Sequence, residues 1–122
     1  MTALDALNPQ QLQAVQHFGS PLLIVAGPGS GKTRVIISRI AYLIEQQQVS
    51  PNKICAVTFT NRAAKEMKTR LTPILGPDAA LVKASTFHSL CASILRKDSG
   101  HMGIANNFVI YDEDDSISVL KL

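Results

Sequence analysis

Residues 26–33, Ala-Gly-Pro-Gly-Ser-Gly-Lys-Thr, combine small residues, a lysine and a hydroxyl in an order that suits the phosphates of a nucleotide. The glycines allow a tight turn that brings backbone N–H groups close to phosphate oxygens. A helix that begins near Lys32 adds the positive end of its dipole. Lys32 would reach the β- and γ-phosphates, and the Thr33 hydroxyl would ligate Mg²⁺. The pattern therefore predicts a nucleoside triphosphate with Mg²⁺ as the ligand.

The loop departs from the strict pattern at one position, because Ala26 stands where the pattern has its first glycine. Alanine is the next smallest residue, so we expect the loop to accept it. The alternative is a glycine-rich turn that binds nothing. The context favours the nucleotide loop, because an apolar run at 22–25 precedes it and a helical pattern over 34–44 follows it.

The surrounding elements predict an α/β fold in which helices flank a parallel sheet. Apolar runs predict buried strands at residues 22–26, 54–59 and 81–86. Helical spacing predicts helices over residues 10–18, 32–47, 61–75 and 88–97, and one more from 112 to the end. Residues 108–110 are expected to form a short extended piece. The expected N-caps are Asn8 (with Pro9 in the first turn), Asn61 and Asp112.

Length and composition set the broad class. With 122 residues, 46% of them hydrophobic, the chain has room for one domain and its core. No apolar run approaches the ~20 residues of a membrane span, and the first residues lack the features of a signal peptide. Cys55 and Cys91 lie in apolar or helical patterns, so we expect buried free thiols. These observations indicate a cytoplasmic protein with no membrane partner.

Charge is unevenly distributed along the chain. Residues 1–111 carry 11 of the 12 Lys and Arg residues but only five of the nine acids. A basic body is compatible with nucleic acid binding, and a generic solvated surface is the alternative. The acidic run at 112–115 suggests either a metal site or a solvated cap at a helix start. Four contiguous acids cannot all face one ion, so we expect the cap.

Four stretches, in this order and spacing, resemble the motifs of superfamily 1 DNA helicases of the UvrD/PcrA/Rep group. Residues 7–11 resemble the Q motif, 26–33 motif I, 58–67 motif Ia and 86–89 motif Ib. The resemblance implies a RecA-like P-loop fold and an ATP-dependent helicase that moves 3′ to 5′ on single-stranded DNA. It also implies that residues 1–107 are an incomplete domain 1A and that 108–122 begin the 1B insertion.

The resemblance assigns roles to individual residues. The implied nucleotide-binding residues are Gln11, Ala26, Gly27, Pro28, Gly29, Ser30, Gly31, Lys32, Thr33 and Arg34. Of these, Lys32 and Thr33 would serve catalysis and Thr33 would hold the metal. Gln11 would bind the adenine edge, because an amide both donates and accepts hydrogen bonds. The alternative to nucleotide binding is that Gln11 and Arg34 are ordinary polar and charged residues on helix surfaces.

The implied DNA-binding residues are Thr58, Phe59, Thr60, Asn61, Thr86 and His88. They follow two predicted strands, and ligands of open α/β sheets collect at the carboxyl ends of strands. Phe59 would stack on a base, unless it is a core aromatic. His88 is expected to contact DNA and not to act as a general base. Arg62 and Lys65 are either DNA contacts or a solvated face.

Hydrolysis needs groups that we do not expect in this chain. A carboxylate must hold Mg²⁺ and another group must position water. In the resembling family, these acids and the arginine fingers lie in later segments. We therefore expect an N-terminal fragment or natural truncation that binds ATP without turnover. The alternative is a binding module that pairs with a helicase or another partner through open sheet edges. A small P-loop kinase or nucleotidase is disfavoured by the matches at 58–67 and 86–89.

Overall fold

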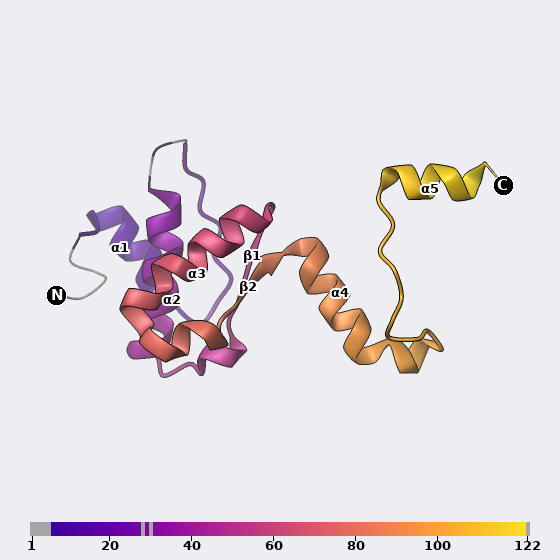
Figure 1. The fold of residues 1–122 in the computed structure, drawn as a ribbon. Coiled ribbons are helices and arrows are strands. Elements are labelled where there is room, and N and C mark those ends of the chain that lie inside the picture. Colours follow the sequence, from indigo (N-terminus) through magenta and orange to yellow (C-terminus); the bar gives the residue numbers. More distant parts are fainter. Residues whose placement is uncertain (1–5, 28, 30, 122) are drawn as a thin grey trace. The chain divides into compact units, whose positions relative to one another are not determined.

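The computed structural model describes residues 6–27, 29 and 31–121, and the chain divides into two compact units (Figure 1). The first unit ends at Thr86 and the second begins at Phe87. In the first unit lie α1 (Pro9–Gln16), α2 (Lys32–Glu45), β1 (Cys55–Thr58), α3 (Asn61–Leu75) and β2 (Lys83–Thr86). In the second lie α4 (Phe87–Asp98) and α5 (Glu113–Leu120). Short 3-10 turns occupy Pro51–Lys53, Gly76–Leu81 and Ser99–Met102.

The sheet of the first unit is a parallel pair joined through α3. β1 and β2 run in register from Cys55 opposite Lys83 to Thr58 opposite Thr86. Parallel strands need a crossover connection, and α3 provides it by packing against both strands (Figure 1). The α/β class and the parallel sheet are therefore confirmed, and both strands end at the same edge.

A compact hydrophobic core holds α2, α3 and the strands together. Met67 and Leu71 lie on one face of α3, four residues apart, and Leu71 is completely buried. Ile37 and Ile40 of α2 join them from the other side. The remaining buried members of this cluster are Ile54, Ala56, Ala79 and Val82. This core fixes the first turn of α2 relative to the ends of the strands.

The second unit is built around α4 and the segment that follows it. The Arg96 guanidinium lies over the Phe108 ring, 5.1 Å from its centroid, a distance at which cations interact with aromatic faces. Asp112 caps α5 by accepting from the Asp115 N–H at 2.8 Å, and an Asp115 carboxylate oxygen accepts from the Asp112 N–H. The predicted cap at the acidic run is confirmed. The short extended piece predicted at 108–110 forms no strand.

The strand predicted at 22–26 is wrong. Residues 21–27 form neither strand nor helix, and the Leu23 and Val25 side chains are 86% and 90% exposed. A strand needs a neighbour that supplies ladder hydrogen bonds. Among the described residues, β1 and β2 pair only with each other, so this apolar segment has no such neighbour.

The cysteines differ from their prediction in one respect. Cys55 and Cys91 are free, as expected, but both are exposed. Successive side chains of a strand point to opposite faces. Because Ala56 is buried in the core, its neighbour Cys55 points away from it. Among the described residues, no helix is long and apolar enough to cross a membrane.

The helix caps agree with the sequence at α1 and differ at α3. Asn8 caps α1, with Pro9 in its first turn. Asn61 was expected to cap α3, but the cap is Thr60, whose hydroxyl accepts from the Ala63 N–H at 3.1 Å. Thr60 has extended backbone angles (φ −124°, ψ 149°), whereas Asn61 is already the first helical residue. A side chain caps from the extended position, which is why Thr60 is the cap.

Replacing Thr60 by alanine should lower the free energy of unfolding by about 1 kcal/mol, because the Ala63 N–H loses its acceptor. Asn61→Ala is the matched control, and we expect a change of no more than a few tenths of a kcal/mol. Urea unfolding followed by circular dichroism measures both. A larger loss in Asn61→Ala than in Thr60→Ala would show that the cap is assigned to the wrong residue.

Candidate nucleotide-binding site

The first turn of α2 begins without a capping side chain. Its N-cap is Gly31, in the left-handed region (φ 82°, ψ 29°), which has no side chain to accept from the first-turn N–H groups. The Gly31 carbonyl already accepts the first helical bond, from the Val35 N–H at 3.1 Å. The N–H groups at a helix start suit an anion. Lys32, Thr33 and Arg34 follow directly, all exposed.

Gly31 is required at its position for two reasons. Its positive φ is a conformation that residues with a Cβ adopt at a cost of about 1–2 kcal/mol. A Cβ at this position would also lie 3.0 Å from Nε2 of Gln11. The close approach places the Gln11 amide directly against the start of α2. The structure thus brings two of the predicted nucleotide-binding residues together from separate elements.

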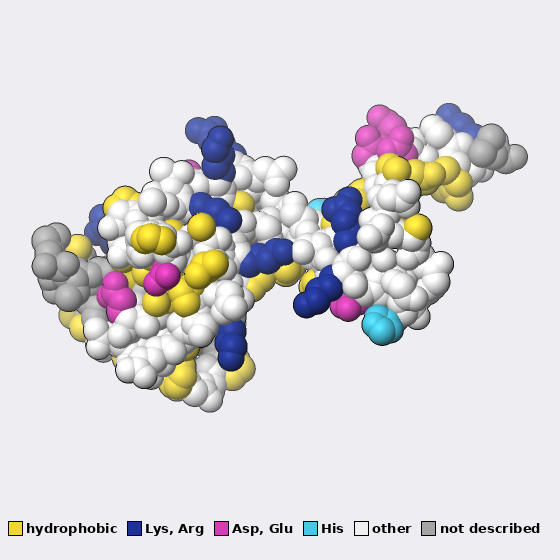
Figure 2. All heavy atoms as spheres, turned by 60° about the horizontal axis from the view of Figure 1, so that its bottom comes forward, with side chains coloured by type: hydrophobic (Ala, Val, Ile, Leu, Met, Phe, Trp, Pro, Cys, Tyr) yellow, Lys and Arg dark blue, Asp and Glu magenta, His cyan; other side chains and the backbone are white. Residues whose placement is uncertain are grey.

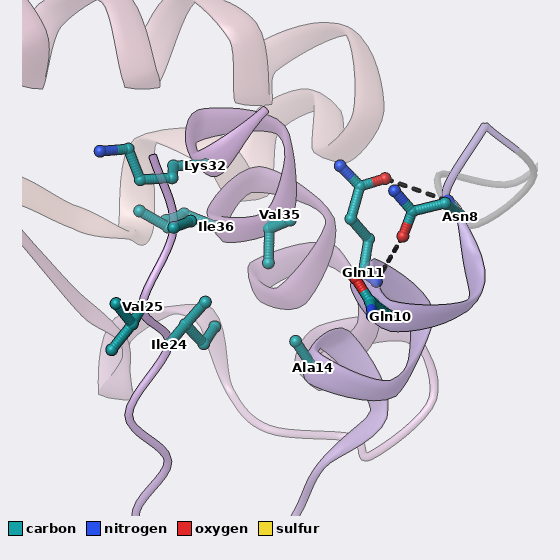
Figure 3. Close-up of a pocket in the computed structure, with 10 residues that line it drawn as sticks. Asn8, Gln10, Gln11, Ala14, Ile24, Val25, Lys32, Val35 and Ile36 are labelled. Carbon is teal, nitrogen blue, oxygen red and sulfur yellow. Dashed lines mark hydrogen bonds between the residues drawn. The ribbon is translucent and has the colours of Figure 1, made fainter. Parts of the chain in front are cut away.

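Gln11 also closes the start of its own helix. Its Oε1 accepts from the Asn8 N–H at 3.0 Å, and the Asn8 Oδ1 accepts from the Gln11 N–H at 2.8 Å (Figure 3). These reciprocal bonds form a capping box. The side chain is therefore held in one orientation. The sequence suggested the cap at Asn8 but did not reveal the part that Gln11 plays in it.

A cleft of about 350 Å³ lies between α1, α2 and the segment that precedes the loop. Its lining residues are Asn8, Gln10, Gln11, Ala14, Ile24, Val25, Ala26, Lys32, Val35 and Ile36. Figure 3 shows Ile24 and Val25 on one side and Ala14 of α1 on the other. The walls are mostly apolar, with amides from α1 and the Lys32 side chain as the polar groups. This composition is typical of a small-molecule site.

The rest of the loop is described in part. Gly29 has a positive φ of 74°, as a tight turn requires, and Ala26 is half-buried in the cleft wall. Gly27 is exposed. Pro28 and Ser30, also predicted to bind nucleotide, lie outside the described residues.

Arg39 is an important residue that the sequence analysis missed. Its Nη1 donates to the carbonyl oxygens of Ala14, Val15 and His17 at 3.0, 3.2 and 2.6 Å. These carbonyls end α1 or follow it directly, and α1 has no basic residue in its own last turn. Arg39 lies within a predicted helix, and nothing in the sequence indicates that its side chain binds a helix end 22 to 25 residues earlier in the chain.

The predicted DNA-binding residues of the first unit gather where β1 and β2 end. Thr58 and Thr86 are paired across the two strands, Thr58 half-buried and Thr86 buried. Thr58 Oγ1 donates to the Thr60 carbonyl at 2.9 Å. The Phe59 side chain between them is 92% exposed, so the alternative of a core aromatic is wrong. Asn61 is exposed beside them.

His88 lies in the second unit and is exposed on α4. It lines a small, mostly apolar cleft together with Cys91, Leu95 and Phe108. Its relation to the strand ends of the first unit stays a prediction. So does the role of Arg62 and Lys65, which are exposed on α3. Figure 2 shows Lys and Arg side chains at several separate places on the face in view, which leaves both explanations of the basic charge open.

The family of the chain follows from comparison with known proteins. The model of the UvrD/REP helicase N-terminal domain matches residues 7–122. The chain therefore belongs to the UvrD/REP helicase family, and it corresponds to the N-terminal part of such a protein. The fold and the loop described above agree with this membership.

Curated relatives include three proteins named ATP-dependent DNA helicase PcrA. The chain is 53% identical to the one from Bacillus subtilis over 118 residues, 97% of its own length. It is 52% identical to the one from Staphylococcus epidermidis over 94% of its length and 50% identical to the one from Staphylococcus aureus over 97%. It spans about 16% of the length of each of these relatives.

Gly31→Ala should lower the free energy of unfolding by about 1–2 kcal/mol, because alanine is strained at the positive φ and crowds the Gln11 amide. The matched control is Gly27→Ala: Gly27 lacks a positive φ, and a Cβ there meets nothing within 4 Å. We expect the control to unfold like the wild type in urea. Equal unfolding of all three proteins would contradict the described start of α2.

Proposed function

We propose that this chain forms the phosphate-binding part of a RecA-like P-loop domain in an ATP-dependent DNA helicase. The observation that carries the proposal is the start of α2, where uncapped N–H groups, Lys32 and Thr33 meet at a left-handed glycine. Identity of about half to proteins named ATP-dependent DNA helicases supports the ligand and the reaction class. In this proposal, residues 1–107 belong to domain 1A and 108–122 begin 1B.

The residues fit MgATP. The backbone from Ala26 to Gly31 surrounds the phosphates, the Lys32 ammonium neutralises charge on the β- and γ-phosphates, and the Thr33 hydroxyl is a Mg²⁺ ligand. Both side chains are exposed. Arg34, one residue further along, adds positive charge. A Mg²⁺ ion held by the Thr33 hydroxyl would neutralise charge on the phosphates.

Gln11 reads the base in this proposal. Its Oε1 accepts one bond from the Asn8 N–H, but an amide oxygen has two lone pairs and the amide nitrogen two hydrogens. The capping box uses one of these sites and orients the amide. Adenine offers a donor at N6 and an acceptor at N7, which match the amide.

We propose that binding by these residues alone does not lead to turnover. Among the described residues that line the cleft, none is an acid that would hold Mg²⁺ or position water. In the acidic run at 112–115, Asp112 and Asp115 cap α5, and Glu113 and Asp114 lie in its first turn. Translocation 3′ to 5′, unwinding and ATP hydrolysis are proposed for a whole cytoplasmic helicase. This chain spans about 16% of the length of its PcrA relatives.

The strand ends provide a surface for single-stranded DNA. In this proposal the exposed Phe59 ring stacks on a base, and Thr58, Thr60, Asn61 and Thr86, which lie at the strand ends and the start of α3, form the rest of the DNA-binding edge. We assign His88 to the same ligand from the second unit. Exposure of Phe59 is the observation that favours this role.

A second function is supported by the exposed segment at 22–25. Four consecutive apolar residues, between 41% and 90% exposed, resemble a strand that lacks its neighbour. A binding module that pairs with a helicase or another chain would use this segment and the open edges of β1 and β2. A stoichiometric complex in sedimentation would support it, and a monomer at all concentrations would exclude pairing with itself.

Lys32→Ala should weaken binding of a fluorescent MgATP analogue at least tenfold, because hydrogen bonds to charged groups contribute about 1.5–3 kcal/mol. Lys53→Ala removes an exposed lysine outside the cleft and is the control, with affinity expected at the wild-type value. Fluorescence titration measures all three proteins. Equal affinity in Lys32→Ala would refute the assignment of Lys32 to the phosphates.

Phe59→Ala should weaken binding of a single-stranded oligonucleotide by about 1–3 kcal/mol, the contribution of one stacked base. Phe18 is also exposed but lies after α1, so Phe18→Ala is the matched control and should bind like the wild type. Fluorescence anisotropy with a labelled oligonucleotide measures the difference. If both variants bind equally well, Phe59 does not contact DNA.

A further inference from the structure

Helix α1 is too short to be stable by itself. It has eight residues, Pro9–Gln16, and isolated helices below about 12–15 residues are marginal in water. Its carboxyl-terminal carbonyls have no partner within the helix. Val15 is completely buried, and Arg39 Nη1 supplies a donor to three carbonyls at this end. The helix therefore depends on α2 for its place.

Arg39 places a positive charge and hydrogen-bond donors at the end of α1, a role that a basic residue in the helix's own last turn usually has. A cation near the negative end of a helix dipole is favourable, and α1 carries none in its own last turn. The guanidinium is half-buried, which strengthens its hydrogen bonds relative to exposed ones. Arg39 lies on the same helix as Lys32, so one rigid element connects the loop to α1.

Two features then fix the position of Gln11. The capping box with Asn8 sets the orientation of its amide within α1. The Arg39 bonds set the position of α1 on α2, and the Gln11 Nε2 comes within 3.0 Å of the position of a Cβ on Gly31. Removing Arg39 leaves the capping box intact and removes the three bonds to the end of α1, so that only packing such as that of Val15 holds α1 on α2.

We propose that Arg39 is a positioning residue for the nucleotide base: by holding the end of α1 on α2 it keeps Gln11 beside the start of the phosphate loop. The proposal rests on the proposed function, in which Gln11 reads adenine. It assigns Arg39 no contact with the nucleotide. Its consequence is a base preference that depends on Arg39 and a phosphate affinity that does not.

The test compares MgATP, MgUTP and magnesium tripolyphosphate on the full chain by titration calorimetry. Arg39→Ala should reduce the preference for ATP over UTP a few-fold to about tenfold, the range of one lost hydrogen bond, and leave tripolyphosphate affinity unchanged. Arg39→Lys keeps the charge and should recover part of the preference. Arg70→Ala removes an exposed arginine of α3 and should behave as the wild type.

A double variant distinguishes positioning from a direct contact. If Arg39 acts through Gln11, Arg39→Ala should cause no further loss of base preference in a Gln11→Ala background. Additive losses would overturn the proposal, and so would loss of tripolyphosphate affinity in Arg39→Ala, which would mean a general structural role. Unchanged preference in Arg39→Ala would overturn it as well.

The position of Gln11 beside Gly31 can also be tested without any nucleotide. If the wild type fails to bind MgATP, that result counts against the proposed function, and this second test still decides whether Arg39 positions Gln11. Nuclear Overhauser contacts between the Gln11 side-chain amide and the Gly31 α-protons should be present in the wild type and Arg70→Ala. They should be weakened or lost in Arg39→Ala. Contacts that persist unchanged in Arg39→Ala would show that Arg39 does not position Gln11.

Discussion

Packing of α2 on two of its sides sets the position of the residues that we propose to bind nucleotide. On one side Ile37 and Ile40 are buried in the core that includes α3 and the strands. On the other, Arg39 binds the carbonyls at the end of α1. Because α2 begins at Lys32, directly after Gly31, both sets of contacts fix the point at which the proposed phosphate loop enters the helix. The described loop residues are exposed, except for the half-buried Ala26, so their position derives from the helix.

A few contacts also hold the edge where β1 and β2 end. Parallel register brings Thr58 and Thr86 together. Thr58 Oγ1 binds the Thr60 carbonyl, and the Thr60 hydroxyl caps α3. The link between strand and helix is thus held at both of its ends, and the Phe59 side chain between them stays in solvent. A large exposed aromatic ring leaves apolar surface in water, and its burial against a partner would be favourable, which is why we assign it a ligand.

Local patterns in the sequence predicted the helices, the parallel pair, the cap at Asn8 and the order of loop and helix, because these depend on neighbouring residues. Two features were predicted wrongly, and one was missed. The strand at 22–26 needs a neighbour that no described residue supplies. The cap of α3 moved to Thr60 because the chain leaves β1 in an extended conformation. Arg39 acts through carbonyl oxygens, which every residue has, so no side-chain pattern indicates its partner.

In the proposed function, the loop before α2 and the Gln11 amide form one nucleotide site. Titration of the ¹⁵N-labelled chain with MgATP, followed through backbone and side-chain amide shifts, tests whether they do. We expect the largest changes on Gly27, Gly29, on 31–34 and on the Gln11 side chain, and no change in the second unit. Changes confined to other residues, or none at saturating MgATP, would contradict it.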